Sequence, residues 1–183
     1  MKVSLCLLLT LALTGPALAA VDPATVSLDH LAQKSYDGRD LTLGKVLATN
    51  GAYTRYYITY KSGELTISGI MNVPKGAGPF PVIITNHGYI NTKVYTNGRG
   101  LKREQDYLAR NGFAVLHPDY RNHNGSSRDP DNDLRLYTGY TEDVINAVQA
   151  VRNSDIKFLD KNKIGMLGHS LGGGIALSIM AVK

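Results

Sequence analysis

The chain has 183 residues, of which 43% are hydrophobic and 19% are charged, and its formal net charge is +5. This length suits one domain with a core of its own, and the composition excludes both an intrinsically disordered chain and an integral membrane protein. No block of lysine or arginine marks a nucleic-acid or membrane surface, so the charge pattern predicts no nucleic-acid partner.

The first 19 residues have the three-part pattern of a signal peptide. Lys2 precedes an apolar run over residues 3–13, and Ala17-Leu18-Ala19 has the small residues of a cleavage site. The run is well short of the ~20 apolar residues that span a bilayer, which disfavours a membrane anchor and predicts no stable membrane insertion. Cleavage after Ala19 would also remove Cys6, the single cysteine. We therefore expect an exported protein, periplasmic or secreted, without disulfide bonds.

Residues 20–52 are expected to form an N-terminal extension. Within it, Leu28, Leu31 and Ala32 have the spacing of one short helix. The segment LTLG, at residues 41–44, resembles a turn.

An incomplete α/β domain is expected over residues 53–183. It begins with two segments rich in β-branched and aromatic residues, 53–60 and 64–73, which predict a hairpin because the short KSG separates them. A loop rich in glycine and proline leads to PVIITN, a continuous apolar run of the kind found in strands buried on both faces. LKREQDYLARN, at residues 101–111, then spaces its apolar residues as a helix and stops at Gly112.

Two more strands alternate with two more helices in the rest of the chain. FAVLHP is the next predicted strand, and Thr141 is predicted to cap a helix with Glu142 and Asp143 in its first turn, where the helix dipole favours acids. KIGMLG is the last predicted strand and LGGGIALSIMAV the last helix. Strands that alternate with helices need crossover connections. The order therefore predicts an α/β fold, with a mostly parallel sheet, an antiparallel start and helices on both faces.

Gly168-His169-Ser170-Leu171-Gly172 lies at the junction between the last predicted strand and helix. In a Gly-x-Ser-x-Gly elbow the serine occupies a strained turn, and the flanking glycines let the backbone close without a Cβ clash. The hydroxyl of Ser170 would be exposed at a helix N-terminus, where free N–H groups and the dipole favour an anion. The alternatives are a turn without chemistry or a phosphate-binding loop, but no lysine follows as a P-loop requires. The context therefore favours a nucleophile.

Asn86-His87-Gly88-Tyr89 follows the buried strand PVIIT. An acyl-transfer enzyme of this layout places an oxyanion-stabilising N–H at this position. The predicted donors are the backbone amides of Tyr89 and Leu171. Gly88 would let the backbone approach the substrate, and His87 is expected to brace the loop rather than to react.

Three segments resemble the α/β-hydrolase superfamily, and more narrowly its prolyl-oligopeptidase-like (S9) and dienelactone-hydrolase or acetyl-xylan-esterase-like branch. They are NHGY, HPDYRNHNGSS and IGMLGHSLGG, and the resemblance covers about residues 53–183. DYRNHNGSS is similar to the family's D-Y-R-G-x-G-x-S loop, with Asn122 where glycine is usual. The resemblance implies that Asp119 and Arg121 are structural.

The same resemblance implies a serine hydrolase that cleaves ester or peptide bonds through an acyl-enzyme on Ser170, without cofactor or metal. In this family the catalytic acid and histidine follow the nucleophile, whereas residues 171–183 contain no Asp, Glu or His. We therefore expect an N-terminal fragment of a longer hydrolase, with the catalytic Asp and His missing and little turnover by this chain. His123, oriented by a nearby aspartate, is a weaker alternative base. The set His117, Asp119 and His123 lacks a recognised metal-ligand spacing.

The substrate and role are open at this point. The stretch before residue 53 is too short for a propeller domain, which favours an esterase-like enzyme acting on small-molecule esters over a gated oligopeptidase acting on short peptides. A non-catalytic binding protein that keeps the elbow as a scaffold is the main alternative. The tyrosines of residues 53–60 could bind lipid or polysaccharide, although tyrosine is also a common strand former. The oligomeric state is left open.

Overall fold

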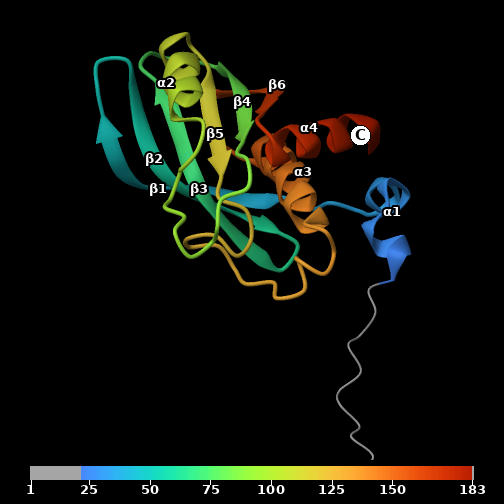
Figure 1. Cartoon of the computed structure of the whole chain (residues 1–183). Coiled ribbons are helices and arrows are strands. Elements are labelled where there is room, and N and C mark those ends of the chain that lie inside the picture. Colours follow the sequence, from blue (N-terminus) through green and yellow to red (C-terminus); the bar gives the residue numbers. More distant parts are fainter. Residues whose placement is uncertain (1–21, 183) are drawn as a thin grey trace, which may run out of the picture.

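Six strands form one mixed sheet in the computed structural model, which describes residues 22–182 (Figure 1). The strands lie in the order β1-β2-β3-β5-β4-β6, which confirms the predicted α/β class. The predicted signal peptide, residues 1–19, lies outside the described residues. In chain order the elements are η1 (Pro23–Val26), α1 (Leu28–Gln33), β1 (Arg39–Thr49), β2 (Tyr53–Ser62), β3 (Leu65–Pro74), β4 (Phe80–Asn86), α2 (Lys102–Arg110), β5 (Ala114–Pro118), α3 (Thr138–Asn153), β6 (Leu159–Gly168) and α4 (Leu171–Val182).

The antiparallel half of the sheet is built from β1, β2 and β3. The predicted hairpin is confirmed, because β2 and β3 pair without interruption along their whole length. β1 pairs with β2, so the sheet already begins within the segment expected to be an N-terminal extension. The turn predicted at residues 41–44 is wrong. Leu41 and Leu43 point inward and alternate with exposed neighbours, which is the period of a half-buried strand.

The parallel half of the sheet places two distant sequence motifs side by side. β4 lies between β5 and β6 and pairs parallel with both. The carboxyl ends of parallel strands share one edge, and here Asn86 at the end of β4 is paired with Gly168 at the end of β6. The loop that follows β4 and the turn that contains Ser170 therefore start next to each other. Within residues 22–182, β6 is the outermost strand on this side.

Helices cover both faces of the sheet (Figure 1). On one face α2 packs against β3 and β5, and Ala109 joins Tyr53 and Val115 in a small buried cluster. On the other face α3 and α4 cover the larger core, to which β5 contributes Leu116 and α3 contributes Val144. Successive residues of β5 thus serve opposite faces, as the pleat requires.

Helix α3 begins at Thr138 rather than after a cap at Thr141, so that prediction is wrong. Thr141 is buried inside the helix, and Glu142 and Asp143 are not in its first turn. Both acids are buried because they form ion pairs with Arg121. Tertiary ion pairing, and not the helix dipole, therefore decides where these carboxylates lie.

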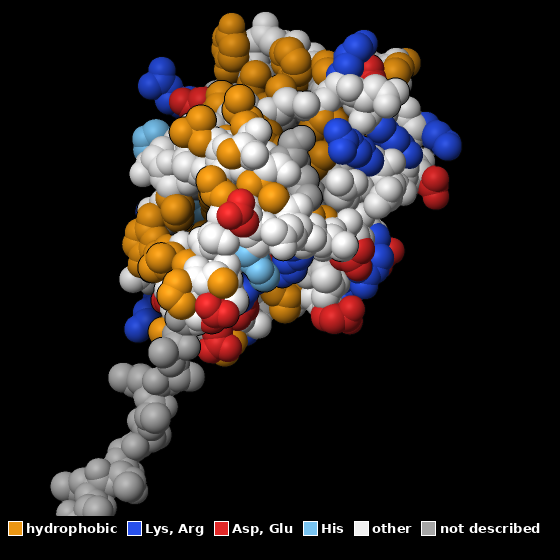
Figure 2. Space-filling model, turned by 90° about the vertical axis from the view of Figure 1, so that its right-hand side faces the viewer, with side chains coloured by type: hydrophobic (Ala, Val, Ile, Leu, Met, Phe, Trp, Pro, Cys, Tyr) orange, Lys and Arg blue, Asp and Glu red, His pale blue; other side chains and the backbone are white. Residues whose placement is uncertain are grey.

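Helix α4 leaves large apolar side chains exposed. Leu177 and Met180 are 69% and 79% exposed, because the helix is apolar around most of its circumference. Figure 2, which looks onto the side of the molecule where α1 and α4 lie, shows hydrophobic side chains gathered at the surface. Across residues 22–182, no helix is both long and apolar enough to cross a membrane.

Candidate active site

Ser170 occupies the turn that joins β6 to α4. Its φ is +54°, a left-handed conformation that L side chains rarely adopt, and the residue is exposed. A Cβ built on Gly168 would lie 2.2 Å from the carbonyl oxygen of Gly172, and one built on Gly172 would lie 2.0 Å from that of Asn86. Close backbone approaches therefore require both glycines, which is the physical reason for the elbow pattern.

The loop after β4 lies against this turn. A Cβ built on Gly88 would lie 3.1 Å from the Cβ of Ser170, so the bare glycine backbone faces the serine. Within residues 22–182, neither the Tyr89 amide nor the Leu171 amide donates a hydrogen bond. Both N–H groups are therefore without an acceptor among the described residues.

His87 is buried below this loop and orients it. Its Nδ1–H donates to the Gly88 carbonyl oxygen at 2.7 Å, and the Tyr120 hydroxyl donates to the His87 carbonyl oxygen at 3.2 Å. The Gly88 carbonyl and the Tyr89 N–H belong to the same planar trans peptide unit and point in opposite directions. The His87 ring therefore fixes the direction of the Tyr89 N–H, and its role in this structure is to brace the loop.

A series of aromatic rings links this loop to helix α3. Neighbouring ring centroids lie between 4.2 and 6.1 Å apart along the series His87, Tyr120, Tyr140, Tyr137 and Tyr89. The Tyr89 ring, which is 62% exposed, ends the series at the surface. Such packing holds a large exposed ring in one place. Sequence reasoning missed this arrangement, because the rings come from three separate segments and have no common spacing.

Asp119 forms hydrogen bonds to the middle of the loop that follows β4. Its carboxylate is fully buried and accepts from the Tyr95 hydroxyl at 2.8 Å, from the Gly98 amide at 2.9 Å and from the Asn97 side chain at 2.8 Å. It also accepts from the Ser68 hydroxyl at 2.6 Å. One carboxylate thus ties the loop after β4 to strand β3.

Arg121 binds a different segment, helix α3. Its Nε and Nη2 atoms donate to the two carboxylate oxygens of Asp143, at 3.0 and 2.8 Å. The same guanidinium lies 2.7 Å from Asp129 and 3.2 Å from Glu142, and Lys34 adds a second cation beside Glu142 at 2.7 Å. Asp119 and Arg121 are therefore both structural, but each serves its own segment.

The structure does not bring a histidine to the Ser170 hydroxyl. Within residues 22–182, no hydrogen bond joins this hydroxyl to a histidine or a carboxylate. His169 is exposed beside the serine. His123 is buried, and its Nδ1 and Nε2 atoms each lie 3.1 Å from a backbone carbonyl oxygen, of Arg121 and Ile90 respectively. These contacts disfavour the alternative in which His123 serves as the base.

His117 is also held in place by its two ring nitrogens. The Thr85 hydroxyl lies 2.9 Å from Nδ1, and Nε2–H donates to the Arg99 carbonyl oxygen at 3.0 Å. In the part of the chain that the structure describes, no group of three or more His, Cys, Asp or Glu residues is arranged to hold a metal ion.

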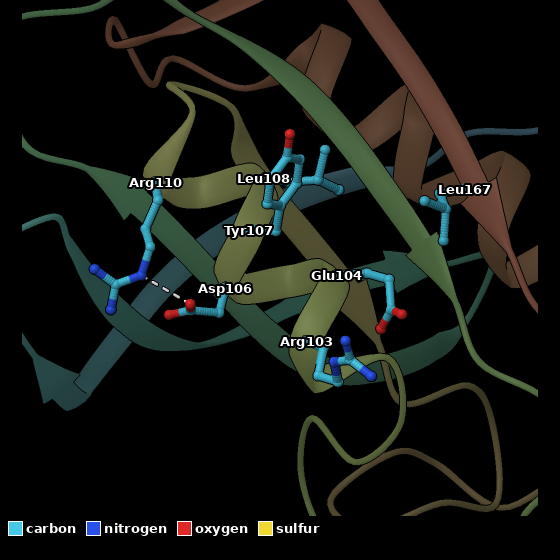
Figure 3. A pocket seen from close by; sticks show the side chains of 7 residues that line it. All are labelled: Arg103, Glu104, Asp106, Tyr107, Leu108, Arg110 and Leu167. Atoms are coloured by element: carbon cyan, nitrogen blue, oxygen red, sulfur yellow. Dashed lines mark hydrogen bonds and ion pairs between the residues drawn. The ribbon is translucent and has the colours of Figure 1, made fainter.

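A cavity of ≈ 610 Å³ lies between α2 and β6 (Figure 3). Apart from Leu167 on β6, its lining comes from α2, including the ion pair in which Arg110 Nε donates to Asp106 at 2.8 Å. None of the lining residues belongs to the Ser170 turn or to the loop after β4. We therefore do not assign this cavity to the candidate active site.

A serine at a strained turn between strand and helix, facing a glycine loop at the carboxyl edge of a parallel sheet, defines a nucleophile-elbow α/β protein. The family model described as alpha/beta hydrolase fold matches residues 81–182. The chain therefore belongs to the alpha/beta hydrolase family.

Solved structures share this fold at low sequence identity. Acetyl xylan esterase 1 from Thermoanaerobacterium sp. aligns with a TM-score of 0.59 and 21% identity, over 85% of this chain and 51% of that chain. Est1E from Butyrivibrio proteoclasticus, solved with ferulic acid, aligns with a TM-score of 0.51 and 21% identity, over 68% and 45%. A dienelactone hydrolase-like promiscuous phosphotriesterase from metagenomic libraries aligns with a TM-score of 0.50 and 21% identity, over 70% of this chain and 54% of that chain. The chain spans about half the length of these structures.

The two histidines under the loop predict an acid-sensitive fold. Burial lowers the pKa of His87 to about 4, although Asp119 opposes this, and burial together with His87 lowers the pKa of His117 to about 3. In the unfolded chain both rings titrate near pH 6.5. Below that pH the unfolded state binds protons that the folded state does not bind, and this favours unfolding. The free energy of unfolding is therefore highest above about pH 6.5, and each ring lowers it by about 3 kcal/mol by pH 4.

Urea denaturation at intervals between pH 7 and pH 4 measures this loss. H117Q should reduce the dependence of the unfolding free energy on pH by the contribution of one ring. An unchanged slope of the unfolding free energy against pH in H117Q would show that folding does not lower the pKa of this ring.

Proposed function

We propose that this chain carries the nucleophile and the oxyanion-binding groups of a serine hydrolase that cleaves ester bonds. One observation carries the proposal: Ser170 is exposed in a left-handed turn, and the loop beside it holds the Tyr89 amide free of other partners. A strained turn of this kind is kept where it serves chemistry. The free Leu171 amide at the start of α4 would supply the second donor.

The reaction follows from these groups. The Ser170 oxygen attacks the ester carbonyl carbon and loses its proton to a base, while the carbonyl oxygen takes up negative charge and accepts hydrogen bonds from the two amides. Collapse of this adduct expels the alcohol, which takes the proton back from the base. Water then attacks the acyl-enzyme, which releases the acid and restores the Ser170 hydroxyl. Because the chain spans about half of the structures it matches, we propose that the Asp and His of the triad come from sequence beyond these residues.

Small-molecule esters are the proposed substrates. The names of the solved structures with the same fold include esterases, and the exposed Tyr89 ring offers an apolar surface beside the serine. Short peptides are the alternative that an S9-like enzyme would favour. A panel of p-nitrophenyl esters and peptide p-nitroanilides, run on the full-length protein, separates the two. We also propose that the protein is exported, which N-terminal sequencing of the mature chain would test.

Covalent labelling tests the nucleophile without requiring turnover. We expect a fluorophosphonate probe to add one label to Ser170, and imidazole in the buffer to accelerate labelling because it replaces the missing base. S170A should take up no label, whereas S178A, which changes a serine on helix α4, should label as the wild type does. Peptide mapping by mass spectrometry locates the label. An unlabelled Ser170 in imidazole would favour the non-catalytic binding protein.

A further inference from the structure

We infer that His123 is a positioning residue for the proposed oxyanion site, because its imidazole holds the loop that presents the Tyr89 amide. The inference rests on the proposed function of Ser170 and deepens it. His123 would not touch the substrate. It would act through the Ile90 carbonyl and through the ring of His87.

The segment between β4 and α2 cannot hold its own shape. Residues 87–101 contain neither strand nor helix, and Tyr89 is 62% exposed. On the upstream side, the carbonyl oxygens of His87 and Gly88 are held by a tyrosine hydroxyl and by the His87 ring. On the downstream side, the hydrogen bond nearest to Tyr89 joins His123 Nε2 to the Ile90 carbonyl oxygen at 3.1 Å. His123 therefore completes a clamp around the donor amide.

The ring of His123 supports the upstream side as well. It meets the ring of His87 edge-on, with centroids 5.4 Å apart and an interplanar angle of 75°. It also lies edge-on to Tyr95, at 4.8 Å and 77°. Because the His87 ring orients the peptide unit that contains the Tyr89 N–H, a change at His123 would reach that N–H by two routes.

The chemistry of the ring sets a condition on this clamp. A carbonyl oxygen can only accept, so His123 must carry its proton on Nε2 to hold Ile90. The Nδ1 atom also faces a carbonyl oxygen, that of Arg121 at 3.1 Å, and a neutral imidazole can donate to only one of the two. The inference therefore requires a proton on Nε2 of His123.

Three substitutions at this position separate the effect of side-chain length from the effect of losing the hydrogen-bond donor. H123Q retains a donor long enough to reach Ile90, H123N retains the amide but is too short, and H123L removes the donor while keeping similar bulk. We expect H123L and H123N to lower the maximal rate of fluorophosphonate labelling in imidazole by about tenfold, with the probe concentration for half-maximal rate unchanged. H123Q should stay within about threefold of the wild type. If H123L fails to fold, the labelling rates of H123Q and H123N, which both have an amide side chain, are compared instead.

His117 provides the matched control. It is a buried histidine that holds the same loop at Arg99, ten residues beyond Tyr89. Its ring also lies 5.4 Å from that of His87, so it differs from His123 in having no contact with the Ile90 carbonyl. H117L should lower thermal stability and slow the labelling of the folded protein far less than H123L does. Equal slowing in H117L and H123L, or equal rates in H123Q and H123N, would overturn the inference.

Two readouts do not depend on reaction at Ser170. NMR order parameters of the Tyr89 and Ile90 amides should fall in H123N and H123L, and not in H123Q. Long-range proton–nitrogen NMR should find the His123 proton on Nε2, and a proton on Nδ1 alone would overturn the inference. If wild-type Ser170 takes up no label, the proposed function fails. The order-parameter and tautomer results then still decide whether His123 holds the loop.

Discussion

Replacing Gly172 by alanine is expected to destabilise the protein by about 3 kcal/mol or more and to prevent labelling of Ser170. The new Cβ would lie 2.0 Å from the Asn86 carbonyl oxygen and 2.7 Å from that of His87. Both are backbone atoms at the carboxyl end of β4, so no side-chain rotation relieves the overlap. Helix α4 must move away from the sheet, which opens the elbow and separates Ser170 from Gly88. Urea denaturation and the labelling assay measure the two effects.

Gly174→Ala is the matched control for this prediction. Gly174 lies in the same helix, and nothing lies within 4 Å of the position that its Cβ would take. Because alanine favours a helix over glycine, we expect G174A to stabilise the protein by up to about 1 kcal/mol. A G172A protein as stable as G174A would show that the elbow tolerates a side chain, against the contacts described above.

Asp143→Ala is expected to cost about 3 to 5 kcal/mol of unfolding free energy. The Asp143 carboxylate is fully buried and receives the Arg121 guanidinium through two bonds, together with the Arg121 amide and the Ser62 hydroxyl. Truncation leaves these donors in the interior without their main acceptor. The remaining partners of the guanidinium are Asp129 at Nη1 and Glu142 at Nη2, so Nε loses its acceptor. Chemical denaturation at pH 7 measures the loss.

Two further variants test the explanation. Asp106→Ala breaks an ion pair with Arg110 on the exposed surface of α2, and we expect a far smaller change in the denaturation midpoint. The double variant D143L/R121M removes both partners of the buried pair and should recover part of the loss, because no charge is then left unpaired. A D143A protein that is no less stable than D106A would mean that water already reaches the Arg121 guanidinium.

Part of the candidate site followed from short sequence patterns. Ser170 and its two flanking glycines were predicted as a nucleophile elbow from five consecutive residues, and the structure places Ser170 in a left-handed turn with no room for a Cβ on either glycine. The catalytic roles of Ser170, Tyr89 and Leu171 stay predictions. Local patterns also failed where a contact far along the chain decided the outcome. LTLG is a strand because it pairs with β2, and the acids after Thr141 lie inside α3, where they bind Arg121.

The sequence by itself determined the order of strands and helices from residue 53 onward and the position of the elbow, because hydrophobic period and glycine sterics act over a few residues. Only the tertiary structure decided which segments meet. The pairing of Asn86 with Gly168 joins residues that are 82 positions apart, and it is this register that sets Gly88 against Ser170. The ring series beneath Tyr89 and the hold of His123 on Ile90 likewise depend on strand order, since β5 lies between β3 and β4. Such contacts depend on where whole strands lie, and no local pattern of residues encodes that.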